Sequence, residues 1–162
     1  MVPKRRVTLL EAQENFAKTI SNGIWALLEK EGRTPSQDED LILMAHSSLY
    51  HWKQIGTAVN LQQGYWMISH VYQVLGDSKQ ALAWALKCQQ VTEKFPGEME
   101  DFDLAYAHEG LARAYAMTND LEKAKKQYDL AAGLGEKIKD PDDKQIFLTD
   151  FEGGNWYQIS PG

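Results

Sequence analysis

A shift of 43 residues brings the middle of this chain into register with itself, and this register constrains the fold more than any other feature. Residues 60–95 fall onto residues 103–138, and the aligned positions share size or chemistry. The aligned pairs are Ile68 with Leu111, Ser69 with Ala112, Tyr72 with Tyr115, Gly76-Asp77 with Asn119-Asp120, Ala81 with Ala124, and Cys88 with Ala131. A short repeated unit cannot bury its apolar face alone, so the register predicts units stacked side by side.

The composition indicates that the repeated units are helical. Ala, Leu, Gln, Glu and Lys dominate, and no long stretch alternates apolar and polar residues. Clear breaks at 31–40, 95–101 and 139–143, with softer ones at 56–57, 76–77 and 118–120, separate the helical stretches. The predicted helices are 8–30, 37–55, 59–75, 78–95, 99–117, 120–138 and 142–152. The expected fold class is therefore all-α, an α-solenoid of about seven helices in antiparallel pairs.

Residues at the helix ends support these boundaries. Asp77 and Asp120 suit N-cap positions, because a carboxylate oxygen can accept from the free N–H groups of a first helical turn. Pro141 suits a first helical position, where its missing N–H costs nothing. Gly76 and Asn119 can take the left-handed conformation that ends a helix.

The length favours one domain. We assign residues 1–155 to a single helical domain and residues 153–162 to a tail. The domain comprises a degenerate first helix pair (8–56), a second pair (59–95), a third pair (99–138) and a capping helix (141–152). Three roles are open for the tail: docking back through Trp156 and Tyr157, a linker, and a partner-binding tag.

The register resembles the tetratricopeptide repeat (TPR), in a long-period variant similar to bacterial proteins of unknown function. The family pattern is matched by Tyr65, Ile68, Ser69, Tyr72, Gly76-Asp77, Ala81 and Cys88, and again by Leu111, Ala112, Tyr115, Asn119-Asp120, Ala124, Tyr128 and Ala131. Ala85 and His108 depart from it, and the period exceeds the usual length of about 34 residues. The resemblance implies a superhelix whose concave face binds a protein or peptide segment, as in an adaptor or scaffold.

The resemblance also selects a candidate partner groove. In helix 59–75 one stripe, which includes Ile68 and Tyr72, is expected to pack against the next helix, whereas the other stripe would line the groove. The candidate groove residues on this stripe and its 43-residue counterpart are Gln63, Trp66, His70, Gln73, Tyr106, Glu109 and Arg113. Amides would bond an extended backbone, aromatic rings would supply apolar contact, and Arg113 would fork onto a carboxylate.

Each of these residues also has a purely structural interpretation. Glu109 and Arg113 have the i,i+4 spacing of an ordinary helix-stabilising ion pair. Trp66 is equally suited to cover a seam between repeats, and His70 to be a polar residue at that seam.

No catalytic motif is present, so we expect no enzyme activity and no cofactor. The chain has neither a phosphate-binding loop nor a GxSxG elbow, and no two histidines have i,i+4 spacing. Cys88 occupies a small-residue packing position and is expected to be an inert core thiol. Two alternatives stay open: an all-helical enzyme or metal protein that uses His46, His51, His70 and His108, and a peptide-sensing regulator.

Charge and cysteine content bear on partners and location. A net charge of -6 argues against non-specific nucleic-acid binding, and the one basic cluster, Lys4-Arg5-Arg6, is interpreted as a solvated tail. A single cysteine fits a reducing compartment, and no apolar run approaches about 18 residues. Residues 1–16 lack a long apolar core and a small-residue cleavage site, so we do not expect them to act as a signal peptide. We therefore expect a cytoplasmic protein with a protein or peptide partner and no membrane, and a homo-oligomer stays open.

Overall fold

The structure is a computed structural model that describes residues 5–159. Lys4 of the basic cluster, the first residues of the predicted domain and residues 160–162 of the predicted tail lie outside this range. The described residues form seven α-helices and no strand, which confirms the predicted fold class. The helices are α1 (Leu9–Leu28), α2 (Pro35–Ile55), α3 (Ala58–Leu75), α4 (Ser78–Lys94), α5 (Asp101–Met117), α6 (Leu121–Glu136) and α7 (Pro141–Glu152), with a 3-10 turn, η1 (Pro96–Glu98). None of them is long and apolar enough to cross a membrane.

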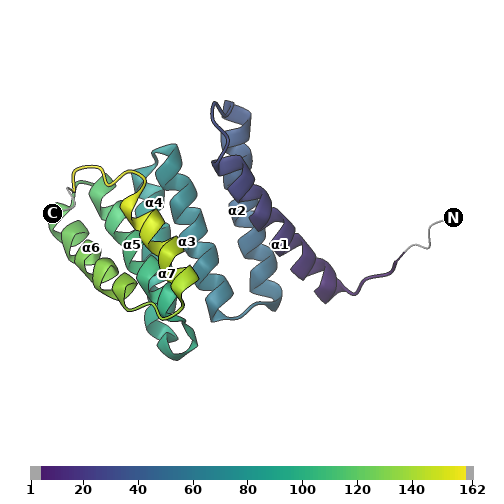
Figure 1. Cartoon of the computed structure of the whole chain (residues 1–162). Coiled ribbons are helices and arrows are strands. Elements are labelled where there is room, and N and C mark those ends of the chain that lie inside the picture. The colour runs from purple at the N-terminus through teal and green to yellow at the C-terminus, as the bar shows by residue number, and fades with distance from the viewer. Residues whose placement is uncertain (1–4, 160–162) are drawn as a thin grey trace.

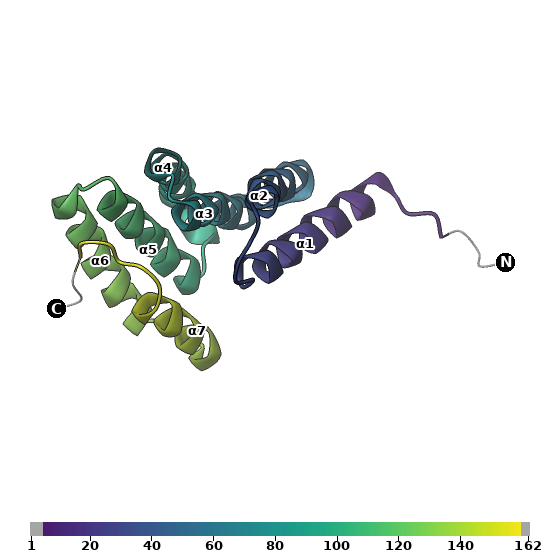
Figure 2. The same ribbon diagram turned by 90° about the horizontal axis from the view of Figure 1, so that it is seen from above.

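Neighbouring helices along the chain pack as antiparallel pairs, α1 with α2, α3 with α4 and α5 with α6 (Figure 1). The first helices of the second and third pairs, α3 and α5, also pack against each other. Viewed from above, α1, α3, α5 and α7 follow an arc, and α2, α4 and α6 lie outside it (Figure 2). The concave side of this arc is thus formed by the first helix of each pair and by α7.

The turns within the second and third pairs have the same geometry, 43 residues apart. Gly76 and Asn119 are left-handed, with φ of 80° and 62°. The backbone N–H groups of Asp77 and Asp120 each donate to the carbonyl of the tyrosine five residues earlier, and their side chains cap α4 and α6. The predicted caps and turn residues are confirmed.

Small residues bring the helices of each pair together. Ala81 and Ala124, which correspond in the 43-residue register, are fully buried at the start of α4 and α6. Cys88 is buried further along α4, on the same side as Ala81. Burial raises the pKa of its thiol to about 12. The predicted core position of Cys88 is therefore confirmed.

Two helix starts differ from the sequence prediction by two residues, and the other starts agree to within one residue. Helix α2 begins at Pro35 rather than at residue 37, because Thr34 and Gln37 form a reciprocal capping box and proline fits the first turn. Helix α5 begins at Asp101 rather than at residue 99, because the preceding residues close the short η1 turn instead.

The chain beyond α6 folds back over the third pair. Pro141 opens α7, as predicted, and α7 packs on α5 and α6 through the buried Phe147. Residues 153–159, which we call the C-terminal segment, then follow, and Trp156 and Ile159 within it are buried. Of the three roles considered for the tail, docking on the domain through Trp156 is the one that the structure shows.

Candidate partner groove

The candidate residues from the second and third pairs meet on the concave side, where α3 and α5 lie side by side. The indole Nε1 of Trp66 donates to Glu109 Oε2 over 3.1 Å, a contact between residues 43 positions apart. Near the start of α5, Gln63 Nε2 donates to Asp103 Oδ1 over 2.9 Å. Toward the other end, Gln73 Nε2 donates to the carbonyl of Gly110 over 3.1 Å. Side-chain hydrogen bonds therefore join the two stripes along their length.

Trp66 lies at the centre of a group of rings. The imidazole of His70 stacks on it at 4.9 Å, and Tyr106 meets it edge-on at 5.3 Å. Trp25, from α1, lies 6.1 Å from Trp66 with its ring tilted by 31°. Gly110 permits the close approach of α5, because a Cβ atom there would lie 2.9 Å from the Trp66 ring.

Glu109 and Arg113 form the ion pair that their spacing suggested, but this pair is buried rather than on the surface. The two residues are 3% and 6% exposed. Arg113 Nε donates to Glu109, and the Arg113 Nη atoms donate to main-chain carbonyls of Asp150, Gly153 and Asn155 at 2.8–3.0 Å. Burial raises the pKa of Glu109, and the donors of Arg113 and Trp66 partly counteract that effect.

Arg113 therefore binds the C-terminal segment of its own chain. The Trp156 ring lies 3.9 Å from its guanidinium carbon, in cation–π geometry. Further along, the Tyr157 hydroxyl donates to the Gln73 carbonyl over 3.3 Å. We expected Arg113 to form a bidentate hydrogen bond with a partner's carboxylate. Its guanidinium instead donates to three carbonyl oxygens of the same molecule.

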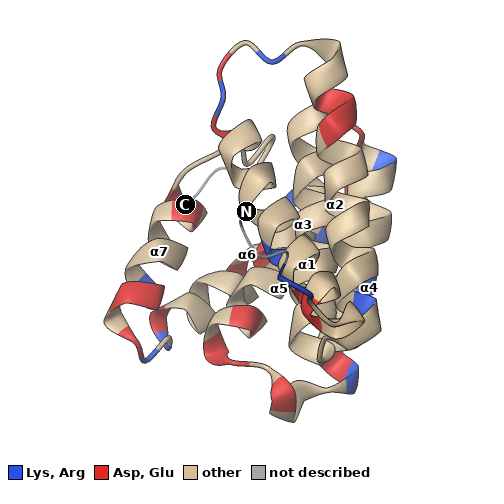
Figure 3. Cartoon of the chain, turned by 90° about the vertical axis from the view of Figure 1, so that its right-hand side faces the viewer, with Lys and Arg blue, Asp and Glu red and all other residues tan. Residues whose placement is uncertain are grey.

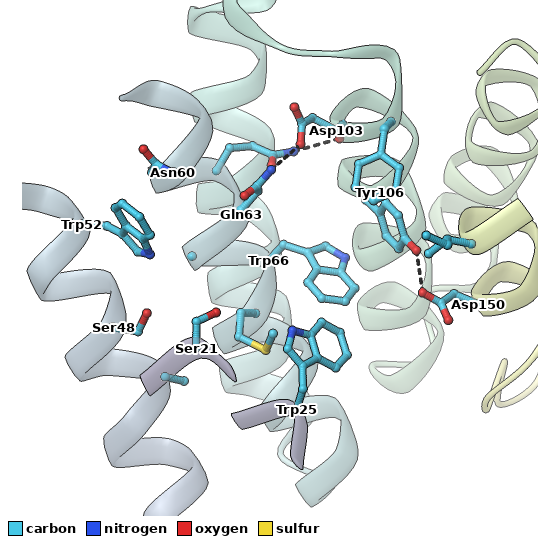
Figure 4. A pocket seen from close by; sticks show the side chains of 16 residues that line it. Ser21, Trp25, Ser48, Trp52, Asn60, Gln63, Trp66, Asp103, Tyr106 and Asp150 are labelled. Carbon is cyan, nitrogen blue, oxygen red and sulfur yellow. Dashed lines mark hydrogen bonds between the residues drawn. The ribbon is translucent and has the colours of Figure 1, made fainter. Parts of the chain in front are cut away.

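Two hollows open along the groove, and together they account for all seven candidate residues. The first has a volume of about 430 Å³ and is lined by Gln63, Trp66 and Tyr106 together with residues of α1, α2 and α7 (Figure 4). The second, of about 340 Å³, lies against the C-terminal segment. Its lining includes Trp66, His70, Gln73, Glu109 and Arg113. Trp25 and Trp66 line both hollows.

Two ionisable rings of the groove, those of His70 and Tyr106, are neutral at pH 7. Burial lowers the pKa of His70 to about 4, and the nearby Arg113 adds to this effect, so the ring is neutral at pH 7. Burial also raises the pKa of Tyr106, whose hydroxyl donates to Asp150 over 2.5 Å. Tyr106 therefore lines the first hollow, and His70 the second, as neutral rings.

The other histidines lie in separate surroundings. His46 lies against Trp84 at 5.0 Å, His51 bonds to Gln13, and the Nδ1 atom of His108 lies 2.6 Å from Gln127. Within residues 5–159, no three His, Cys, Asp or Glu side chains are placed to hold a metal ion together. The four histidines do not form one site.

Sequence reasoning missed Trp25, Trp52 and Asp150, which also line the first hollow. The first helix pair has no counterpart in the 43-residue register, so no repeat marks the concave face of α1 or α2. Comparisons with protein-family models, with curated proteins and with solved structures give no match for this chain. The site is therefore defined by its geometry alone.

Proposed function

We propose that this protein is a TPR-like interaction module that holds a peptide or protein segment on the concave side of its helical arc. The observation that carries the proposal is the first hollow, which is lined in part by residues of α1 and α7 and bordered by aromatic rings. Trp25 at its rim is 40% exposed, although tryptophan is usually more buried. Aromatic side chains in a concave site are frequent anchors of protein recognition.

The surroundings of the hollow suit a partner segment. Its walls come from helices α1, α2, α3, α5 and α7, so binding would require little ordering of the protein itself. Gln63 and Asn60 place side-chain amides at the same hollow, where they could bond to the backbone of an extended segment. The repeated turns at Gly76 and Asn119 support the TPR-like part of the proposal. A cytoplasmic location, favoured by the single cysteine, belongs to the same proposal.

Selection from a random library of phage-displayed 12-residue peptides tests this proposal. We expect the full chain to enrich peptides whose affinity falls at least about tenfold in the Trp25→Ala variant, because an anchor contact is lost. The matched control is Leu43→Ala, which truncates a side chain on α2 that is 61% exposed and does not line either hollow. Failure to enrich any peptide, or equal binding by both variants, would show the proposal to be wrong.

A further inference from the structure

The first hollow combines many aromatic rings with acidic groups. Five of its lining residues are aromatic: Trp25, Trp52, Trp66, Phe102 and Tyr106. Its charged lining residues are Asp103 and Asp150, and no Lys, Arg or His within residues 5–159 lines it. A hollow that served only to bury a hydrophobic side chain would not require two carboxylates. Covering a carboxylate with a neutral group costs free energy, because the charge loses its contact with water.

Two of the rings of this hollow keep part of their surface exposed, because Trp25 is 40% exposed and Trp66 is half-buried. His70 covers one face of Trp66 but does not line the first hollow, whereas Trp66 lines both. In Figure 4 the rings of Trp25, Trp66 and Tyr106 lie next to one another along the hollow, with Gln63 and Asp103 beyond Trp66. The faces of aromatic rings carry negative potential, which attracts a cation within about 6 Å of the ring centroid.

Among the described residues that line the hollow, no basic side chain accompanies these two carboxylates. Asp150 accepts a hydrogen bond from the neutral Tyr106 hydroxyl, and Asp103, only 2% exposed, accepts from the Gln63 amide and the Glu100 backbone N–H. The nearby guanidinium of Arg113 is paired with Glu109, so that pair adds no net charge. Figure 3 shows acidic residues at both ends of α7, the helix whose Ile146 and Asp150 line the hollow. The local field therefore favours a positive group.

We propose that the first hollow binds the cationic side chain, arginine or lysine, of the partner segment. Trp25 and Trp66 supply the ring faces, and Asp150 and Asp103 supply the compensating negative charge. This inference rests on the proposed function and specifies its ligand class: a segment with a basic residue at its anchor position is bound, and an acidic one is rejected.

The test titrates the ¹⁵N-labelled full chain with N-acetyl-arginine N-methylamide and follows the indole N–H signals by NMR. The neutral, near-isosteric citrulline compound is the control, at the same ionic strength. Signals are assigned with Trp25→Phe and Trp66→Phe variants. We expect saturable shifts of both indole signals with the arginine compound, and binding about tenfold weaker with the citrulline compound. Equal binding of the two compounds, or no shift, would overturn the proposal.

Two charge variants separate a local carboxylate from the overall charge. In Asp150→Asn the amide oxygen can still accept from Tyr106, so the ring arrangement is kept while one charge is lost. We expect this variant to weaken binding of the arginine compound several-fold and to leave binding of the citrulline compound unchanged. Glu122→Gln removes one charge from α6, which does not line the hollow, and is expected to bind as the unmodified chain does. An equal loss in both variants would contradict a local role.

The outcomes distinguish this inference from the proposed function. Selected peptides that require Trp25 but bind equally well with citrulline in place of arginine would leave the proposed function standing and remove the cation pocket. Saturable shifts with the arginine compound, but no selected peptide, would leave the cation pocket standing and remove the proposed function. Indole shifts that appear on raising the protein concentration alone would assign the hollow to a second copy of the chain and overturn the inference.

Discussion

Arg113 illustrates how far a single side chain can depart from its local pattern. Its spacing to Glu109 predicts an ion pair, and that pair is present. Burial of such a pair costs free energy unless the remaining donors are satisfied, and here three main-chain carbonyls of residues 150–155 satisfy them. Those acceptors lie about forty residues further along the chain, so no local pattern could have predicted that Arg113 would be buried.

His70 makes stability depend on pH. Its folded-state pKa of about 4 lies below the usual histidine pKa of 6.5, so the unfolded chain takes up a proton first as the pH falls. The stabilisation is therefore complete above pH 6.5 and is lost between pH 6.5 and 4, by up to about 3 kcal/mol. The His70→Phe variant keeps a flat ring on Trp66 but cannot titrate.

Urea unfolding at pH 7.5, 6, 5 and 4.5 measures this effect. We expect the free energy of unfolding of the unmodified chain to fall more steeply over this range than that of His70→Phe. Other acid-sensitive groups contribute equally to both proteins, so the difference between the slopes isolates His70. Parallel slopes would mean that His70 is protonated equally in the folded and unfolded states.

At the level of elements, the helices and their ends were predictable, whereas the neighbours of each helix were only partly so. Turn signals at Gly76 and Asn119 are local, because they depend on backbone conformation and on the caps that follow. The contact of Trp25 with Trp66 depends on how the first pair sits against the second, and that pair lacks the repeat pattern. The groove between α3 and α5 was therefore anticipated, and the wall supplied by α1 was not.

Alanine substitutions at two glycines near the end of α6 separate the effect of packing on stability from the effect of helix propensity. A Cβ atom at Gly135 would lie 2.3 Å from the ring of Phe147, whereas nothing lies within 4 Å of one at Gly133. We expect Gly135→Ala to destabilise the protein by about 1–3 kcal/mol, because α7 must shift. Gly133→Ala should stabilise it by about 0.5–1 kcal/mol, because alanine restricts the unfolded chain and favours the helix.

Chemical denaturation of both variants checks this pair of predictions. Opposite signs are the expected result, since the two substitutions add the same methyl group two residues apart. A similar gain in both would indicate that α7 is held too loosely to resist the added methyl group.

Across the whole molecule, the all-α arrangement follows from the sequence, but the docking of the C-terminal segment on the third helix pair does not. The 43-residue register relates α3–α4 to α5–α6 and ends before residue 153. Trp156 packs on Tyr128 and Phe151 at about 5 Å, and neither contact is implied by the register. This is why Arg113 and Gln73 of the predicted groove proved to contact the chain's own C-terminal segment.

Truncation measures how much the docked C-terminal segment contributes to the free energy of unfolding. Ending the chain after Glu152 removes the buried Trp156 and two of the carbonyl acceptors of Arg113, so we expect a loss of about 3 to 5 kcal/mol in unfolding free energy. Ending it after Ile159 keeps every contact described above and serves as the control. Equal thermal midpoints for the two truncated proteins would show that the C-terminal segment contributes nothing.

The contact between Arg113 and the C-terminal segment also has a consequence for biosynthesis. Neighbouring helices pack in chain order, so each pair can form while the ribosome is still extending the chain. Residues 153–155 emerge after all seven helices, and until then the guanidinium of Arg113 lacks two of its carbonyl acceptors. A nascent chain that stops after α7 would therefore hold a poorly solvated charge in its interior, which would leave it open to quality-control proteases.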